Sequence, residues 1–520
     1  MIAVIKALVL NEVRLRMRRT ATLVTLLAVV AISWLMIVDP AGGSALIVVG
    51  DARVLYTSSA LAVGSATLGA MLFGLGGFYL VRGRIAEDVR SGTGSVIAST
   101  PVGNALFVVS RWLGGVVYLG ALVLAFMLTI MVLQLVRGDG PIEPLVYLQS
   151  FTLLLLPMIV FTVSCATLFD NWALLMGKAG DVLFFFVWVA QLAVVMPMTD
   201  ATAIGQVPAV AAIDFNGMGA AMLIVTKAVN TNHVALGGGD FKANVAPVTM
   251  TNALWGAKLI AMRGVACLIG LLPLLLAIGV FHRFSPDKVK VSTASKRRSP
   301  LAWLNQQLSP VARLVAPLFR LAARTPGMPG QVMGDVALTL AINPTALLTL
   351  IVASVTALVA PRAALAPIML SALAFWGILI SDISTRDRAA GTTDMTGAVH
   401  GGIVNRYLRQ YAAALALGLF FTGVVALRWS VDQPFRALVL VAGVASMSAL
   451  ATMFGRCSGT ARLFMALFLF WEYVEINAGK LAYFDAVGFS NSANVQSLSA
   501  WLVAGAVALA AGYAWNRREA

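Results

Sequence analysis

The chain has 520 residues, of which 60% are apolar and 11% are charged, and its mean hydropathy is +0.89. This composition excludes a soluble globular protein and predicts an all-α polytopic membrane protein. The net charge of +15 does not indicate a nucleic-acid partner. We count 27 of the 37 lysines and arginines in segments that the order of the apolar runs places in the cytoplasm, which is the positive-inside bias of membrane proteins.

The apolar runs predict about 12 transmembrane helices, because about 18 apolar residues are needed to cross the hydrocarbon core as a helix. Both termini are then expected in the cytoplasm, and the protein is expected in the inner membrane of the cell. In the first half the runs cover 20–38, 58–81, 109–136, 145–169, 178–198 and 264–282. In the second half they cover 344–360, 364–382, 410–427, 437–454, 460–474 and 498–515.

The N-terminal 19 residues do not read as a cleaved signal peptide. Their apolar stretch, Ile2 to Leu10, comes before the basic cluster that ends at Arg19, which is the reverse of the order in a signal peptide. This order predicts an interfacial helix that leads into the first span.

A polar loop follows the second predicted span and reads Glu87-Asp88-Val-Arg-Ser-Gly92-Thr93-Gly-Ser-Val-Ile-Ala-Ser-Thr-Pro101. Gly92 permits a turn at positive φ. The apolar segment 96–98 follows and Pro101 ends it, because the residue before a proline avoids the helical region. The pattern predicts a polar turn and a short helix at the membrane surface, joined to two spans.

The same motif returns 299 positions later as Asp387-Arg388-Ala-Ala-Gly391-Thr392. A second echo lies upstream, where Asn11-Glu12-Val13 matches Gly334-Asp335-Val336 at an offset of 323. The two offsets differ by 24 residues, so one loop of the second half is expected to be shorter. We therefore predict two repeated six-helix bundles, residues 1–282 and 335–520, joined by a cytoplasmic linker at 283–334.

The linker 283–334 is strongly basic. From Leu301 to Arg324, apolar residues recur at helical spacing with arginines between them, which favours an amphipathic helix on the inner membrane face near anionic headgroups. Pro310 and Pro317 are expected to break or bend this helix. A solvated tether is the alternative. Two external loops, 199–263 and 475–497, precede the last span of each half; they either dip back into the protein or form plain surface connections.

The loop from Glu87 to Pro101, with Arg111 opening the third span, resembles the cytoplasmic loop of ABC-transporter permeases of the type-2 export class. In that family an acidic residue, Gly-Thr, a short apolar stretch and a Thr-Pro pair recur before the third span. The basic stretch from Glu12 to Arg19 and the external loop before the sixth span are also similar to that family. The resemblance covers roughly residues 10–282 and 335–515.

The resemblance implies that this chain is the membrane-spanning subunit of an ATP-driven exporter, with two six-helix halves fused into one chain. It further implies that two cytosolic ABC ATPase subunits dock on the loops after the second and eighth spans. The first docking element would comprise Glu87, Asp88, Gly92, Thr93 and Pro101. The second would comprise Asp387, Arg388, Gly391 and Thr392. His400, which stands where the first loop has Pro101, is a departure from the family pattern.

ATP chemistry is not expected in this chain. A phosphate-binding loop needs G-x-x-x-x-G-K followed by Ser or Thr, and the two Gly-Lys pairs, at Lys178 and Lys480, lack this pattern. We therefore expect no cofactor in this chain, and ATP is expected to be bound by the partner subunits. The other expected partners are membrane lipids and a transported substrate that the sequence does not identify.

The main alternative is a secondary active transporter of the major-facilitator type, which also has two six-helix halves. Asp387-Arg388 resembles its loop motif, but Gly391 follows the basic residue by three positions instead of two. A proton-coupled carrier is also expected to bury ionisable groups in its spans, and here Glu472, beside Glu475, is the main candidate. A membrane enzyme is disfavoured, because the three histidines and three cysteines are scattered without catalytic or metal-ligand spacing.

Overall fold

The computed structural model describes residues 2–18, 20–195, 207–229, 233–284, 300–398, 402–477 and 481–518. The chain divides into two compact units, Met1–Ser295 (unit 1) and Lys296–Ala520 (unit 2). The division falls inside the basic segment that the sequence marks as a linker. His400 lies outside the described residues.

The protein is a helical, polytopic membrane protein. In the described part of the chain, eight helices are long and apolar enough to cross a membrane, or up to ten if each of two bent helix pairs forms one span. In unit 1 these eight include α3 (Ser58–Val81), α6 (Asn104–Arg137), α7 (Pro144–Asn171) and the pair α11 and α12 (Ala257–Ile269, Leu272–Val280). In unit 2 they include α17 (Leu365–Ile380), α20 (Gly402–Asp432), α21 (Pro434–Ser458) and α23 (Val495–Arg518).

The other four predicted spans are shorter helices. The segments 20–38 and 344–360 form α2 (Thr20–Met36) and α16 (Pro344–Val359). Each follows a preceding helix, α1 (Ile2–Met17) or α15 (Gly327–Ile342), and the bend between α15 and α16 is 100°. The segments 178–198 and 460–474 form α8 (Lys178–Ala193) and α22 (Arg462–Asn477), each of 16 residues. A helix of that length spans about 24 Å, so the number of twelve spans stays a prediction.

Unit 1 contains a small sheet that the sequence did not predict. Strands β1 (Ser44–Val49) and β2 (Ala52–Arg53) lie between α2 and α3, and β3 (Val234–Asp240) comes from the segment before α11. The order is β2-β1-β3, with Val48 opposite both Arg53 and Ala235 in antiparallel register. In unit 2 the corresponding connection between α16 and α17 is the short 3₁₀ turn η4 (Arg362–Ala364). This contrast accounts for most of the difference between the two repeat offsets.

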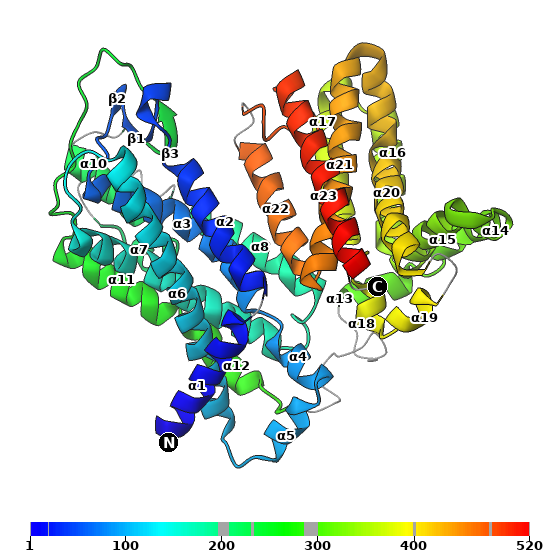
Figure 1. The fold of residues 1–520 in the computed structure, drawn as a ribbon, viewed down its shortest axis with the longest axis horizontal. Coiled ribbons are helices and arrows are strands. Elements are labelled where there is room, and N and C mark those ends of the chain that lie inside the picture. Colours follow the sequence, from blue (N-terminus) through cyan, green and yellow to red (C-terminus); the bar gives the residue numbers. More distant parts are fainter. Residues whose placement is uncertain are drawn as a thin grey trace. The chain divides into compact units, whose positions relative to one another are not determined.

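The segment before α11 packs back onto the spans of unit 1. It contains the 3₁₀ turn η2 (Ala209–Ile213) and helix α10 (Met218–Val229), which packs against α3 and α7. Four side chains of α10 are buried, namely Ala220, Ala221, Ile224 and Val225. Of the two alternatives for this loop, the structure favours the one in which it dips back into the protein. Figure 1 shows α10 and the sheet at one end of unit 1, and α1 at the other.

The last span of unit 1 begins at Ala257 instead of 264, so Arg263 lies inside it and not in a loop. Pro157 lies within α7 and has no N–H, so the carbonyl of Leu153 loses its helical donor. The Nε of Arg263 donates to that carbonyl at 2.8 Å, and a guanidinium nitrogen lies 3.7 Å from the carboxylate of Asp214. Arg263 and Asp214 are both buried. The sequence did not single out either residue.

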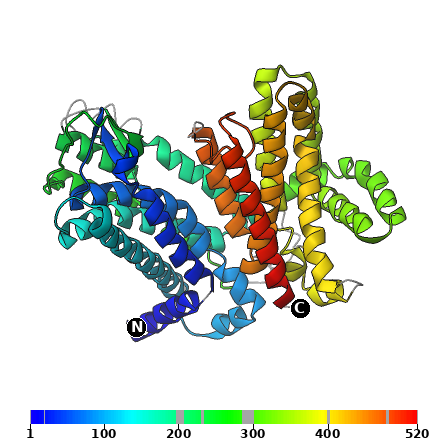
Figure 2. The same ribbon diagram turned by 45° about the horizontal axis from the view of Figure 1, so that its top comes forward.

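In unit 2 the basic segment before α15 forms three short elements. They are α13 (Pro300–Gln307), the 3₁₀ turn η3 (Val311–Val315) and α14 (Ala316–Arg324). Pro310 precedes η3 and Pro317 lies in the first turn of α14, so the two prolines divide the helical stretch as predicted. Helix α14 packs against α15, and both can be followed in green at the edge of unit 2 in Figure 2.

Candidate functional site: two equivalent loops

The first loop (loop 1, residues 82–103) contains two short helices joined by a tight turn. Helix α4 (Arg84–Arg90) is followed by Ser91 and by Gly92, which has a φ of 75°, and α5 (Thr93–Ser99) begins after it. The hydroxyl of Thr93 donates to the backbone carbonyl of Asp88 at 3.2 Å. Thr100, the residue before Pro101, is extended and ends α5.

The second loop (loop 2, residues 381–398) repeats this turn. Helix α18 (Arg386–Ala390) ends at Gly391, which has a φ of 68°, and α19 (Thr393–Gly397) follows. The backbone N–H of Thr392 donates to the carbonyl of Asp387 at 2.9 Å, and its hydroxyl lies 3.4 Å from the same carbonyl.

The shared turn gives a physical reason for the repeated motif. Glycine adopts positive φ without the steric cost that a Cβ brings. The threonine after it bonds back to the aspartate five residues earlier, which closes the turn. The aspartate carboxylate then remains available for a partner outside the turn.

In loop 1 that partner is an arginine of the third span. The carboxylate of Asp88 forms a salt bridge with Arg111 near the start of α6, and a second guanidinium, of Arg84, lies 3.8 Å away. Arg84 also approaches Glu12 of α1 at 3.1 Å, and Arg16 pairs with Glu12 at 2.7 Å. These five residues, which we call the loop 1 ion network, connect α1, α4 and α6.

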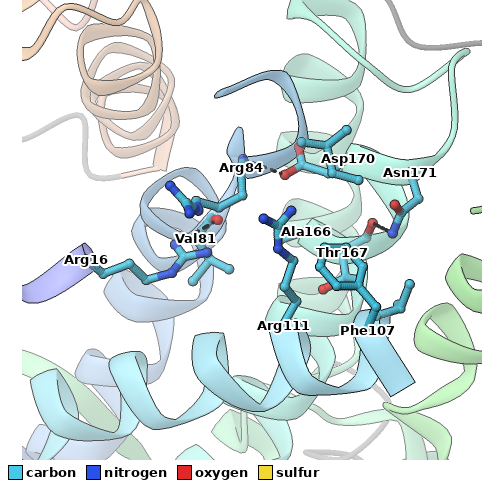
Figure 3. A pocket seen from close by; sticks show the side chains of 11 residues that line it. Arg16, Val81, Arg84, Phe107, Arg111, Ala166, Thr167, Asp170 and Asn171 are labelled. Atoms are coloured by element: carbon cyan, nitrogen blue, oxygen red, sulfur yellow. Dashed lines mark hydrogen bonds between the residues drawn. The ribbon is translucent and has the colours of Figure 1, made fainter. Parts of the chain in front are cut away.

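A small cavity of about 30 Å³ lies within this network. The side chains of Arg16, Arg84 and Arg111 converge on it, and Asp170 and Asn171 of α7 lie on its other side (Figure 3). A cavity must offer roughly 10–15 Å³ to a water-sized probe to hold one water molecule, so this one has room for about two. It therefore offers no room for a substrate, and we assign the site a structural role in holding loop 1.

Glu12 is ionised within the network. Burial opposes its ionisation, but the positive charges of Arg16, Arg111 and Arg84 outweigh burial and lower the pKa of Glu12 below its ordinary value. The negative charges of Glu12, Glu87 and Asp88 raise the pKa of Arg84 against the effect of burial. The network is consequently a set of compensated charges, which suits a buried position at a helix junction.

Loop 1 is also attached to α7, α8 and the end of α12. The carboxylate of Asp170 accepts hydrogen bonds from the backbone N–H groups of Gly83 and Arg84 at 2.7 and 3.1 Å, which caps the start of α4. Arg82 forms a salt bridge with Asp181 in the first turn of α8. After α12, Arg283 donates to the carbonyl of Ala98 at 3.1 Å.

In loop 2 the aspartate again faces an arginine of the third span, at a longer distance. The carboxylate of Asp387 lies 4.0 Å from Arg406 of α20, and its side chain is 23% exposed, compared with 7% for Asp88. Arg406 also donates to the hydroxyl of Thr396 at 3.0 Å. The acid of the preceding helix is Asp335 of α15, which pairs with Arg409 of α20 at 2.7 Å.

Asp335 and Glu12 occupy matching places but have opposite electrostatics. Burial raises the pKa of Asp335 above its ordinary value, and the nearby charge of Asp387 adds to this, while Arg409 and Arg386 only partly compensate. Glu12 has three arginines around it and its pKa is lowered. The loop 1 ion network thus favours the ionised form of Glu12, whereas the surroundings of Asp335 disfavour its ionised form.

The remaining predicted site residues lie on the surfaces of the two loops. Glu87 is exposed and pairs with Arg84 at 2.7 Å. Pro101 and Arg388 are exposed, and the Arg388 guanidinium lies beside Gly459, between α21 and α22. The sequence did not single out Arg84, Asp170 or Arg406, because nothing in the local pattern shows which arginine or aspartate of another helix reaches a loop. The echo between Glu12 and Asp335 was the available signal.

The two units share one more feature, an arginine at the opposite end of the third span that caps the end of the first span. In unit 1, Arg137 at the end of α6 donates to the carbonyls of Trp34 and Ile37, where α2 ends. In unit 2, Arg428 of α20 donates to the carbonyls of Ala357 and Ala360 at 2.6 and 2.7 Å, where α16 ends. An arginine at the C-terminus of a helix satisfies its free carbonyls and its dipole.

We compared the chain with protein-family models, with curated proteins and with solved structures, and none of the three comparisons found a match.

Proposed function

We propose that the protein is the transmembrane permease subunit of an ATP-driven ABC exporter. Two six-helix halves in one chain would form the translocation pathway, and separate cytosolic ATPase subunits would dock on loops 1 and 2. The observation that carries the proposal is the repetition of one Asp–Gly–Thr turn, tied in both units to a third-span arginine.

The direction of the loops supports a cytoplasmic docking site. In each unit the loop lies at the start of the third span. The arginine that caps the end of the first span lies near the opposite end of that third span. The two halves therefore have the same internal direction. The excess of lysine and arginine on the loop side then favours the cytoplasm for both loops and for both termini, in the inner membrane.

Each loop carries one large apolar side chain that is exposed. Val96 of α5 is 65% exposed and Met395 of α19 is 75% exposed. They lie 299 positions apart, which is the offset of the motif. A single exposed apolar residue is common, but an exposed apolar residue at the matching position of both polar loops favours contact with two copies of one partner.

The attachments of loop 1 support a mechanical role. The ion network joins it to α1 and α6, Asp170 joins it to α7, and Arg82 joins it to α8. A push on α5 by an ATPase would therefore move several spans together. The few charges in the spans favour an apolar or amphiphilic cargo, while cofactor chemistry is assigned to the ATPase, which binds ATP.

A cysteine cross-linking experiment tests this proposal. Val96→Cys and Met395→Cys, in a background without the three native cysteines, should each form cross-links to the ABC ATPase subunits that co-purify with the protein. Leu502→Cys on α23, where Leu502 is 48% exposed, is the matched control and should form none. Export from proteoliposomes should need ATP. Export that proceeds without ATP, with no ATPase recovered on purification, would refute the proposal.

The buried acids Glu472 and Glu475 in α22 favour a second candidate, a proton-coupled secondary transporter of the major-facilitator type. The same proteoliposomes distinguish the two candidates. A carrier would move its substrate under an imposed pH gradient without ATP, and a permease with its ATPase would move it under ATP without a gradient.

A further inference from the structure

The segment that precedes α15 in unit 2 carries positive charge and no negative charge. Between Asp287 and Asp335 the sequence has eight lysines and arginines and not one aspartate or glutamate. Three of these cations, Arg313, Arg320 and Arg324, lie in η3 and α14, and all three are exposed. The function proposed above gives this surface no role.

The three arginines have no partner in the described part of the chain. No ion pair or side-chain hydrogen bond joins any of their guanidinium groups to another described residue. The nearest helix, α15, contributes one acid, Asp335, and that carboxylate pairs with Arg409 of α20 at 2.7 Å. A group of like charges without acidic neighbours attracts an anionic partner from outside.

Large apolar side chains are exposed beside these arginines. Leu314 is 65% exposed, Phe319 is 40% exposed and Leu321 is 52% exposed. Arg320 and Arg324 are one helical turn apart and share one side of α14, and Phe319 and Leu321 flank Arg320. Arginines between exposed leucine and phenylalanine are typical of a helix in the membrane interface. There the guanidinium groups meet the headgroups while the apolar side chains enter the acyl region.

Contacts within unit 2 hold this surface at the level where α16 begins. The Oδ1 of Asn305 in α13 accepts hydrogen bonds from the backbone N–H and the hydroxyl of Thr345, in the first turn of α16, at 3.1 and 2.9 Å. The turn η3 packs against both α15 and α16. Because α15 and α16 meet at 100°, α15 runs along the surface of a membrane that α16 crosses. Figure 1 shows α14 and α15 extending sideways from α16.

We propose that the three arginines and the three exposed apolar side chains form a binding surface for anionic lipid headgroups, next to the start of α16. Each guanidinium group can donate two parallel hydrogen bonds to a lipid phosphate. A bound lipid would hold α14 against the membrane and, through α15 and η3, would fix the point at which α16 enters it. The proposal depends on α16 as a span and not on an ATPase.

Hydrogen exchange of the full-length protein tests the proposal in two kinds of nanodisc. One contains phosphatidylcholine, and the other contains phosphatidylcholine and phosphatidylglycerol in equal parts. The amides of 311–324 should be better protected in the anionic nanodisc. Each arginine near an anionic surface should change the open-to-closed ratio about fivefold, so the three together should change it up to about 100-fold. At about 1 M salt, where the Debye length is about 3 Å, most of this difference should vanish.

Substitutions of the arginines separate lipid binding from a general effect of the membrane surface. The triple variant Arg313→Gln, Arg320→Gln, Arg324→Gln should lose the difference between the two nanodiscs, and lysine at the same three positions should keep it. Arg362→Gln is the matched control, because the Arg362 side chain is 72% exposed beyond the other end of α16, where it pairs with Asp432. This control should keep the difference.

Three outcomes would overturn the proposal. They are equal protection of 311–324 in both nanodiscs, a triple glutamine variant that keeps the difference, and protection that arises only when an ATPase is added. The last result would identify an acidic protein surface as the occupant. Failure of an ATPase to bind loops 1 and 2 would leave all these exchange results unchanged, so this proposal and the proposed function can fail separately.

Discussion

Loops 1 and 2 share one turn but differ in how firmly their surroundings hold them. The turns match in the φ of Gly92 and Gly391 and in the threonine that bonds back to the aspartate. Around Asp88 there are two arginines, and α7, α8 and the end of α12 add further contacts. Around Asp387 the nearest arginine is 4.0 Å away.

The difference follows from a few substitutions between the repeats. At the motif offset of 299, Ile383 stands where loop 1 has Arg84 and Ser381 stands where it has Arg82. At the upstream offset of 323, Thr339 stands where α1 has Arg16. Without counterparts of Arg16 and Arg84, Asp335 has a raised pKa where Glu12 has a lowered one. The two units thus share the turn, which is local, and differ in the charges, which come from other helices.

Removal of the third-span arginines, Arg111 and Arg406, is expected to give the largest difference in stability between variants of the two loops. Arg111→Ala leaves Glu12 and Asp88 short of positive charge in a buried place, and uncompensated buried charges cost about 3–5 kcal/mol. Arg406→Ala should cost less, because Asp387 is partly solvated. Thermal unfolding of the two purified variants in detergent measures this. Equal losses would mean that the surroundings of the two loops do not differ in energy.

Neutralising Asp88 should again destabilise the protein more than neutralising Asp387, but the difference should be smaller than for the arginines. Asp88→Asn removes a buried charge that Arg111 and Arg84 share, and should destabilise by about 1–3 kcal/mol. Asp387→Asn should cost about 1 kcal/mol or less, because exposed ion pairs contribute little. Under the proposed function both variants should also lower ATPase binding. A larger loss for Asp387→Asn would contradict the order of burial.

Where the loops are alike, their variants should behave alike. Gly92→Ala and Gly391→Ala each place a Cβ at positive φ, which costs about 1–2 kcal/mol. Neither added Cβ has a neighbour within 4 Å, so the cost is one of backbone conformation alone. Unfolding midpoints that fall by similar amounts would support a shared turn, and an effect in one loop only would refute it.

The smallest effects are expected in the pH dependence of stability, where Glu12 and Asp335 should act with opposite signs. The pKa of Glu12 is lowered, so its contribution to stability is present above its ordinary value of 4.5 and is lost as the pH falls below it. The pKa of Asp335 is raised from 3.8, so its contribution is present at lower pH and is lost as the pH rises. Glu12→Gln should therefore destabilise at neutral pH, and Asp335→Asn should be neutral or slightly stabilising.

The stability differences of Glu12→Gln and Asp335→Asn from the wild type should both disappear in acid, where Glu12 and Asp335 are protonated in the wild type. Unfolding midpoints of the two variants and the wild type, measured at neutral and at acid pH, decide the matter. A Glu12→Gln penalty that persists in acid would show that the residue acts through packing and not through its charge.

The sequence alone was enough to predict a helical membrane protein, helices at all twelve apolar segments, the break of the basic segment at Pro310 and Pro317, and a positive-φ turn at Gly92. These features depend on residues that are close in sequence, through hydropathy, proline geometry and glycine φ. The matching motifs of the two loops were also visible in the sequence, because the residues of each motif are close together in the chain.

Tertiary structure decided what the sequence could not. β1 finds its main partner in β3, far along the chain, and Arg263 finds the carbonyl that Pro157 frees. The partners of Asp88 come from α4 and α6. A charged group is stabilised by whichever opposite charge or donor the packed helices bring within a few ångströms, and no local pattern encodes that distance.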